Sequence, residues 1–255
     1  MIIDCHCHAG TGDGLTGPWD TAAPIEPYLR RAQAAGIDKT VVFAPFQGDY
    51  ARGNAEVARI IARYPDRLIG FGFVHARRDA GRIRKMIDQA VRGWGFRGIK
   101  VHRHDAPATR EVCEAAREFQ VPILYDVGGQ VYRAELIATE YPDVNLIIPH
   151  LGSFGDDWRA HVATIDLIAR YPNVYTDTAG SRRFDYVVQA IKRGGAHKVL
   201  FGSDGPWLHP GLELHKIRLL QLPPRAEAQI LGGNLLRLIK TARVPARNGQ
   251  HRTTV

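Results

Sequence analysis

The chain has 255 residues, of which 45% are hydrophobic and 24% are charged, and its formal net charge at pH 7 is +8. This is an ordinary composition for one soluble globular domain, and no apolar run approaches the roughly 18 residues that a membrane span needs. The basic residues are dispersed along the predicted helices, as on a solvated outer face, so we do not expect a nucleic-acid partner despite the positive charge.

The first predicted element is an apolar strand that carries two histidines, His6 and His8, at alternate positions. Alternate side chains of a strand point the same way about 7 Å apart, so one metal ion can reach both. Cys5 and Cys7 are expected to lie on the opposite face of the strand. All three cysteines, Cys5, Cys7 and Cys113, are expected to be buried free thiols. The strand begins with no secretory leader before it, so we expect a cytoplasmic protein.

Further apolar runs follow in chain order, and amphipathic helical stretches separate them. We predict eight strands, over residues 2–8, 39–45, 67–74, 97–102, 121–126, 145–150, 173–178 and 198–203. Helical spacing is clearest at Val57, Ile60, Ile61 and Tyr64, and at Ile83, Met86, Ile87 and Ala90. Proline ends several of these helices, as in Tyr64-Pro65, Tyr141-Pro142 and Tyr171-Pro172.

The alternation of strands and helices predicts an α/β fold, a single-domain (β/α)8 TIM barrel over residues 1–242. An open doubly wound sheet is the structural rival. Residues 243–255 are predicted to form a disordered basic tail.

Five of the eight predicted strands end in polar residues that can bind metal or substrate. These are His6 and His8 on the first strand, Lys100 and His102 on the fourth, Asp126 on the fifth, His150 on the sixth and Asp204 on the eighth. A single strand-end histidine is usually a hydrogen-bonded cap. Barrel enzymes, however, place their working residues at the carboxyl ends of the strands, so the coincidence predicts an active site there.

The His-x-His strand is accompanied by three further motifs, Pro149-His150-Leu151-Gly152, Phe201-Gly202-Ser203-Asp204-Gly205-Pro206 and Ile230-Leu231-Gly232-Gly233-Asn234. Together they resemble the metal-dependent amidohydrolase superfamily, in particular the branch that includes aminocarboxymuconate semialdehyde decarboxylase and related aromatic-acid decarboxylases. The resemblance implies that His6, His8 and Asp204 bind one divalent ion, usually zinc. It also implies that His150 acts on substrate or water as an acid or a base.

One position departs from the pattern of that branch, because Asp126 stands where its members have a further metal-binding histidine. We favour Asp126 as a replacement ligand; the alternatives are that His150 or His75 fills the position, or that the metal is weakly bound or lost. An oxygen-richer ligand set shifts the preference from zinc toward manganese or magnesium. In binuclear members of the superfamily, a lysine such as Lys100 could be carboxylated and bridge two metals. The missing histidine on the fifth strand favours a mononuclear site in this chain.

The expected substrate is a small carboxylate-bearing molecule, bound by Lys100, His102 and Trp207. Two reactions stay open: hydrolysis through a metal-activated water, with Asp204 and His150 as catalytic residues, and non-oxidative decarboxylation of an aromatic or unsaturated acid. A TatD-like nuclease is disfavoured because such proteins have a glutamate where this chain has Lys100. A non-catalytic barrel is a further alternative, and a homodimer is one expected assembly.

Overall fold

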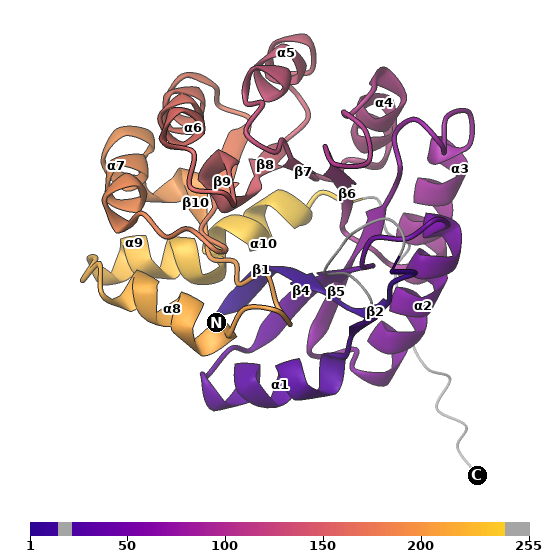
Figure 1. Ribbon diagram of the computed structural model, residues 1–255, viewed down its shortest axis with the longest axis horizontal. Helices are drawn as coiled ribbons and strands as arrows, with labels where there is room; N and C mark the ends of the chain where they lie inside the picture. Colours follow the sequence, from indigo (N-terminus) through magenta and orange to yellow (C-terminus); the bar gives the residue numbers. More distant parts are fainter. Residues whose placement is uncertain (15–21, 243–255) are drawn as a thin grey trace, which may run out of the picture.

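The computed structural model of the protein describes residues 1–14 and 22–242, so the tail predicted at residues 243–255 lies outside the described residues. Eight parallel strands run in the order of the chain around a barrel, and helices surround them (Figure 1). The strands are β1 (Ile3–His8), β4 (Lys39–Phe43), β5 (Leu68–Phe73), β6 (Gly98–His102), β7 (Ile123–Asp126), β8 (Leu146–Ile148), β9 (Val174–Asp177) and β10 (Val199–Leu200). The predicted TIM barrel is therefore confirmed, and each predicted strand contains an observed one.

The ends of the sheet meet through backbone hydrogen bonds between β1 and the segment that follows β10. Cys5 N donates to Phe201 O at 2.9 Å, Asp204 N to His6 O at 2.8 Å and His8 N to Gly205 O at 2.7 Å. These bonds bring Asp204 alongside the two histidines of β1.

Helices connect successive strands and lie on the outside of the barrel (Figure 1). They are α1 (Ile25–Ala34), α2 (Tyr50–Arg63), α3 (Ile83–Asp88), α4 (Arg110–Phe119), α5 (Tyr132–Glu140), α6 (Trp158–Arg170), α7 (Phe184–Gly194), α8 (Pro210–Arg218), α9 (Pro224–Ala228) and α10 (Asn234–Ile239). A short antiparallel pair, β2 (Gly10–Thr11) and β3 (Ala22–Ala23), follows β1 and was not predicted.

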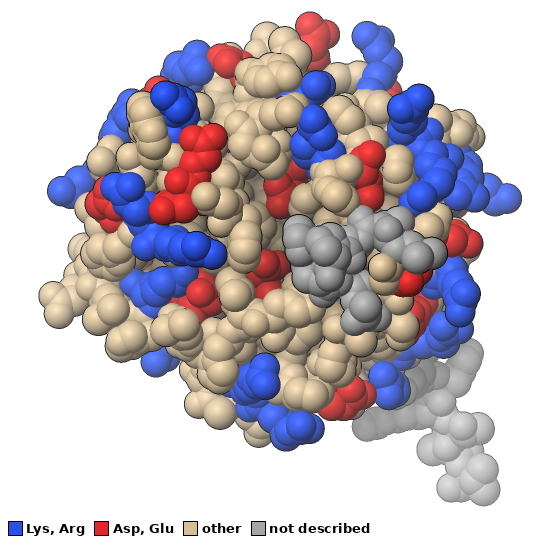
Figure 2. Space-filling model, viewed as in Figure 1, with Lys and Arg blue, Asp and Glu red and all other residues tan. Residues whose placement is uncertain are grey.

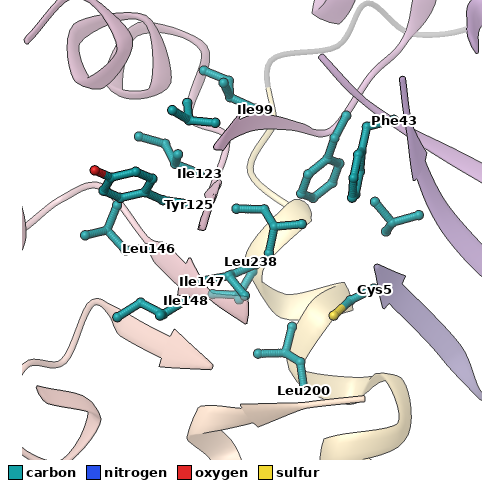
Figure 3. Close-up of a cluster of buried hydrophobic side chains, with 14 of the residues drawn as sticks. Cys5, Phe43, Ile99, Ile123, Tyr125, Leu146, Ile147, Ile148, Leu200 and Leu238 are labelled. Carbon is teal, nitrogen blue, oxygen red and sulfur yellow. The ribbon is translucent and has the colours of Figure 1, made fainter. Parts of the chain in front are cut away.

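Apolar side chains of the strands fill the barrel and the layer between strands and helices. Figure 3 shows part of this core, in which Ile147, Leu200 and Leu238 lie close together. Leu238 belongs to α10, which contacts β10. In the segment before α10, Ile230 O accepts a hydrogen bond from the N–H of Phe201, the residue after β10. The apolar runs of the sequence thus form the rigid body that supports the polar strand ends.

The first strand does not alternate strictly. Its pairing with β4 shifts register between Asp4 and Cys7, and both Cys5 and His6 reach one carboxylate oxygen, Asp177 Oδ2. The expected placement of Cys5 on the face opposite His6 is therefore wrong, because the irregularity breaks the period of two. The three cysteines are buried and unpaired, as predicted.

Among the described residues, none of the helices is both long and apolar enough to cross a membrane. Lys and Arg side chains are scattered around the periphery of the face seen in Figure 2 and do not gather into one patch there. On this face the basic side chains are dispersed, as the sequence indicated.

Candidate metal centre

The carboxyl ends of the strands bring His6, His8 and Asp204 together. His6 Nε2 lies 3.4 Å and His8 Nε2 lies 3.7 Å from Asp204 Oδ1, and the three ligand atoms all lie within 4.8 Å of one another. Ligands about 2.0–2.1 Å from one tetrahedral ion are about 3.3 Å apart, so the separations suit a shared divalent ion. Asp204 reaches this place with a left-handed backbone, at φ 57°.

Each histidine of β1 has its other ring nitrogen bound to an acceptor. His6 Nδ1 lies 2.9 Å from Asp177 Oδ2, and His8 Nδ1 lies 3.2 Å from Ala44 O. Because a carboxylate and a carbonyl accept hydrogen bonds, Nδ1 carries the hydrogen in both rings and each neutral ring offers its Nε2 lone pair. The donor chemistry of the site therefore fits a divalent metal ion.

The electrostatic surroundings favour the neutral form of both rings. Burial lowers the pKa of His6, and the charge of Lys100 lowers it further. Burial, followed by His6 and Lys100, lowers the pKa of His8 well below its usual value. A metal ligand must be deprotonated, so these shifts prepare the pair for binding.

Asp177, the last residue of β9, is a functional residue that the sequence reasoning missed. Besides His6 Nδ1, it accepts hydrogen bonds from the backbone N–H groups of His150 at 2.9 Å and Ala179 at 3.0 Å. Burial alone raises the pKa of Asp177, but His6 and His150 outweigh it and lower the pKa. Its position at the end of an apolar strand, the rule that selected Asp126, would have found it.

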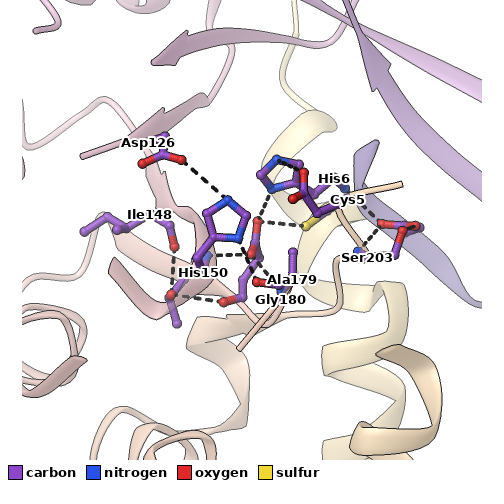
Figure 4. Close-up of polar contacts among 12 residues, drawn as sticks. Cys5, His6, Asp126, Ile148, His150, Ala179, Gly180 and Ser203 are labelled. Carbon is purple, nitrogen blue, oxygen red and sulfur yellow. Dashed lines mark hydrogen bonds and ion pairs between the residues drawn. The ribbon is translucent and has the colours of Figure 1, made fainter. Parts of the chain in front are cut away.

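His150 lies beside the candidate metal ligands, with its ring centroid 4.8 Å from that of His6. Its Nδ1 lies 2.7 Å from Ala179 O and its Nε2 lies 3.4 Å from Asp126 Oδ2 (Figure 4). Burial lowers the pKa of His150, but the contact with Asp126 and the charge of Asp204 outweigh it and raise the pKa to about 9. The ring can therefore hold a proton at neutral pH.

Asp126 ends β7 and faces two imidazoles. Its Oδ2 lies 3.0 Å from His102 Nε2, and its Oδ1 accepts a hydrogen bond from Gly128 N at 2.8 Å. Burial raises the pKa of Asp126, but His102 and then His150 outweigh it and hold the pKa well below its usual range. Among the described residues, ligand atoms converge in two groups, His6 with His8 and Asp204, and His6 with His150 and Asp177. Asp126 is in neither group, and its ligand role stays a prediction.

Lys100 is a fully buried residue of β6, and its Nζ lies 4.9 Å from the centre of the Phe43 ring. Among the described residues, no hydrogen-bond acceptor contacts that Nζ. Burial lowers the pKa of Lys100, while Asp126, Asp177 and Asp204 oppose the shift. The side chain lies in the barrel interior, within electrostatic reach of the candidate metal ligands.

Two further predicted residues contact the site. The Trp207 ring centroid lies 4.4 Å from that of His8, and His102 lies edge-on to Phe46 at 4.7 Å. Phe154, 43% exposed, lies edge-on to His150 at 5.2 Å. Aromatic rings therefore border the candidate metal ligands.

Several other residues near the strand ends have local structural contacts. His75 Nδ1 accepts hydrogen bonds from Arg77 N and Arg78 N, and His209 Nδ1 accepts one from Gly211 N at the start of α8. Trp158 is 51% exposed at the start of α6. His75 is in neither converging group of described residues.

Comparisons with known proteins agree with the barrel. The sequence model of a family described as Amidohydrolase matches residues 3–240. None of the curated proteins matches the chain.

Several solved structures are similar in fold, each over 94% of this chain. A 2,6-dihydroxybenzoate decarboxylase from Rhizobium is 18% identical with a TM-score of 0.73 over 98% of its own chain. A dihydroxybenzoic acid decarboxylase from Polaromonas, with bound manganese and the inhibitor 2-nitroresorcinol, is 18% identical with a TM-score of 0.72 over 96% of its chain. A probable 2-pyrone-4,6-dicarboxylic acid hydrolase from Acinetobacter baumannii, with citric acid bound, is 15% identical with a TM-score of 0.72 over 99% of its chain. At these identities the likeness establishes a shared fold.

Proposed function

The chain belongs to the amidohydrolase family, and from this premise we propose that it is a metal-dependent hydrolase acting on a small carboxylate-bearing substrate. The observation that carries the proposal is the convergence of His6 Nε2, His8 Nε2 and Asp204 Oδ1 at the carboxyl ends of the strands. A barrel needs none of these side chains there for packing. The Nδ1 contacts of His6 with Asp177 and of His8 with Ala44 leave the Nε2 atoms of both rings available.

A divalent ion at this centre supplies Lewis acidity, which polarises a substrate carbonyl and lowers the pKa of water. Zinc is our first choice for it, and manganese or magnesium are the alternatives. Asp204 accepts a proton from the attacking water at a carboxylate oxygen. His150 holds a proton on Nε2, where Asp126 balances its charge, and donates it to the leaving group.

We further propose that Lys100 and Trp207 bind the substrate, whereas His102, also expected to do so, has its ring nitrogens directed to His104 N and to Asp126. The buried charge of Lys100 attracts a carboxylate, and Trp207, beside His8, offers an aromatic face. The carboxylate ligands named for the structural neighbours support this substrate class, since one was solved with 2,6-dihydroxybenzoate and another with citric acid.

Decarboxylation is the second candidate reaction. It is favoured by the decarboxylases among the structural neighbours, two of them named for dihydroxybenzoates. In this reaction the centre binds the hydroxyl or carboxylate of the acid, and His150 protonates the carbon that carbon dioxide leaves.

The decisive experiment starts with the metal content of purified protein, for which we expect about one divalent ion per chain. His6→Ala should lose the ion, while His197→Ala, a change at an exposed histidine in the turn before β10, should keep it. Retention of metal by His6→Ala would refute the metal centre.

A substrate screen then separates the two reactions. Lactones and hydroxybenzoates are incubated with the zinc, manganese and magnesium forms, and acid production and carbon dioxide release are measured separately. Acid production without carbon dioxide supports the hydrolase, whereas carbon dioxide release supports the decarboxylase and overturns the hydrolase. If the metal-loaded protein yields neither acid nor carbon dioxide, the result would favour a binding function.

A cytoplasmic location and a homodimer also belong to this proposal. The buried unpaired thiols of Cys5, Cys7 and Cys113 support a reducing compartment. The mass of the protein in solution, measured by light scattering, tests the dimer, and a monomeric mass would contradict it.

A further inference from the structure

Asp126 has a set of contacts that differs from that of a metal ligand. Its Oδ2 faces two imidazole nitrogens, His102 Nε2 at 3.0 Å and His150 Nε2 at 3.4 Å, and its Oδ1 accepts from Gly128 N at 2.8 Å. Figure 4 shows the Asp126 carboxylate joined to the His150 ring by one of these contacts. Each oxygen therefore already has at least one hydrogen-bonding partner.

The backbone determines which nitrogen of His102 carries hydrogen. His102 Nδ1 lies 3.0 Å from His104 N. Because a backbone N–H can only donate, Nδ1 is the acceptor, so the hydrogen of the neutral ring is on Nε2, which faces Asp126. His102 therefore donates to the carboxylate, and its ring lies edge-on to Phe46.

The His150 ring is oriented from two sides. Ala179 O, 2.7 Å away, accepts the hydrogen of Nδ1. The opposite nitrogen, Nε2, faces an oxygen that can only accept, so a hydrogen on Nε2 makes this contact attractive. The ring is thus held between a carbonyl from the segment after β9 and a carboxylate from β7.

The position of Asp126 also argues against a direct bond to the ion. Two ligands about 2.1 Å from one ion can be at most about 4.2 Å apart. Asp126 falls outside the group formed by His6, His8 and Asp204, whose ligand atoms lie within 4.8 Å of one another. Asp126 would have to move toward them to bind the same ion.

We propose that Asp126 and His102 are positioning residues: His102 orients the Asp126 carboxylate, and that carboxylate holds His150 beside a metal bound by His6, His8 and Asp204. Three protein ligands leave coordination positions open for water and substrate, as in catalytic sites. This inference rests on the proposed function, because it presupposes the metal centre.

Metal retention distinguishes this role from that of a ligand. Wild type, Asp126→Ala, His6→Ala and the control His197→Ala are loaded with zinc, dialysed against a weak chelator and analysed for metal. We expect His6→Ala to lose at least ten times more metal than wild type, and Asp126→Ala to stay within about threefold of wild type. Equal loss in both variants would overturn the inference and leave the metal centre standing, whereas retention in His6→Ala would overturn the proposed function itself.

The histidine rings give a second readout, independent of any substrate. In ¹⁵N-labelled protein at one pH, we expect the Nε2–H resonance of His150 to shift or broaden in Asp126→Ala and in His102→Ala. His102→Gln, which restores a donor, should recover the wild-type signal. Circular dichroism checks folding, and Asp126→Asn replaces Asp126→Ala if the latter does not fold. An unchanged His150 resonance in the folded Asp126 variant would refute the positioning role.

Discussion

Asp177 acts on the candidate centre through His6. A carboxylate that accepts from the free nitrogen of a metal-binding histidine fixes the tautomer and the ring orientation and raises the basicity of the ligand. Asp177 makes this contact at 2.9 Å and also binds the backbone of His150. One side chain thus orients a candidate metal ligand, His6, and the backbone of His150.

Asp177→Asn should therefore weaken metal binding about 10- to 100-fold, the usual effect of losing such a partner. The amide replaces one acceptor oxygen with a donor, so it cannot serve His6 and the two backbone N–H groups together. Competition with a chelating dye measures the affinity. Asp185→Asn, at an exposed residue paired with Arg183, is the matched control, and equal affinities in the two variants would contradict the role of Asp177.

The site residues that the sequence predicted are those recognisable from their residue type and their position at a strand end, without knowledge of their contacts. His6, His8, Asp126, His150 and Asp204 each end an apolar strand, and the closure of the barrel explains why these ends meet. The partners of these residues were hidden because they depend on register. The irregularity in β1 is invisible in the sequence, and so was the approach of both Cys5 and His6 to Asp177.

At the scale of secondary-structure elements, Asp4 joins β1 to the segment after β10. Its Oδ1 accepts from His6 N at 3.0 Å and Ser203 N at 2.9 Å, and its Oδ2 accepts from the hydroxyls of Tyr28 and Ser203. The residue is fully buried. These bonds set the separation of the strand that carries His6 and the segment that carries Asp204.

Asp4→Ala should lower the free energy of unfolding by about 3 kcal/mol or more, because buried donors left without acceptors cost about 1–3 kcal/mol each. Urea denaturation measures the loss. Asp66→Ala, at an exposed residue in the turn before β5, is the control and should change the free energy of unfolding by less than about 0.5 kcal/mol. A loss of that small size in Asp4→Ala would show that the network does not hold the two segments together.

The backbone after β10 also approaches β1 closely at Gly202. A methyl group there would lie 3.0 Å from His6 Cβ and 3.3 Å from Asp177 Cγ. Contacts this short require the neighbours to move, and overpacking costs about 1–3 kcal/mol. The glycine therefore permits the approach that places Asp204 beside the histidines.

Gly202→Ala should reduce metal affinity at least tenfold, because His6 or the segment carrying Asp204 must shift by several tenths of an ångström. Gly155→Ala is the control, since its added methyl would meet nothing nearer than Ser153 Oγ at 3.7 Å. Isothermal titration with zinc compares the two. A Gly202→Ala protein that binds zinc as tightly as Gly155→Ala would show that this approach is not needed for binding.

At the scale of the whole molecule, the barrel depends on its apolar strands and helices. The core includes buried residues of every strand of the barrel, among them Val42, Phe71, Ile147 and Leu200. The sequence predicted this body because strand runs and helical spacing alternate regularly. It did not predict the β2–β3 pair, whose two-residue strands carry too little pattern to recognise.

Because the core is built from apolar side chains of all the barrel strands, removal of the ion should leave the fold intact. A ligand at 100 times its dissociation constant stabilises the native state by about 2.7 kcal/mol. For a chain of this size we therefore expect chelation to lower Tm by roughly 5–10 °C with the same far-ultraviolet dichroism. Zinc added back should restore Tm in wild type but not in His8→Ala, whose ring nitrogen is one of the three converging donors. An unfolded metal-free protein would mean that the ion is structural, and a Tm insensitive to zinc would mean that the three donors do not bind it.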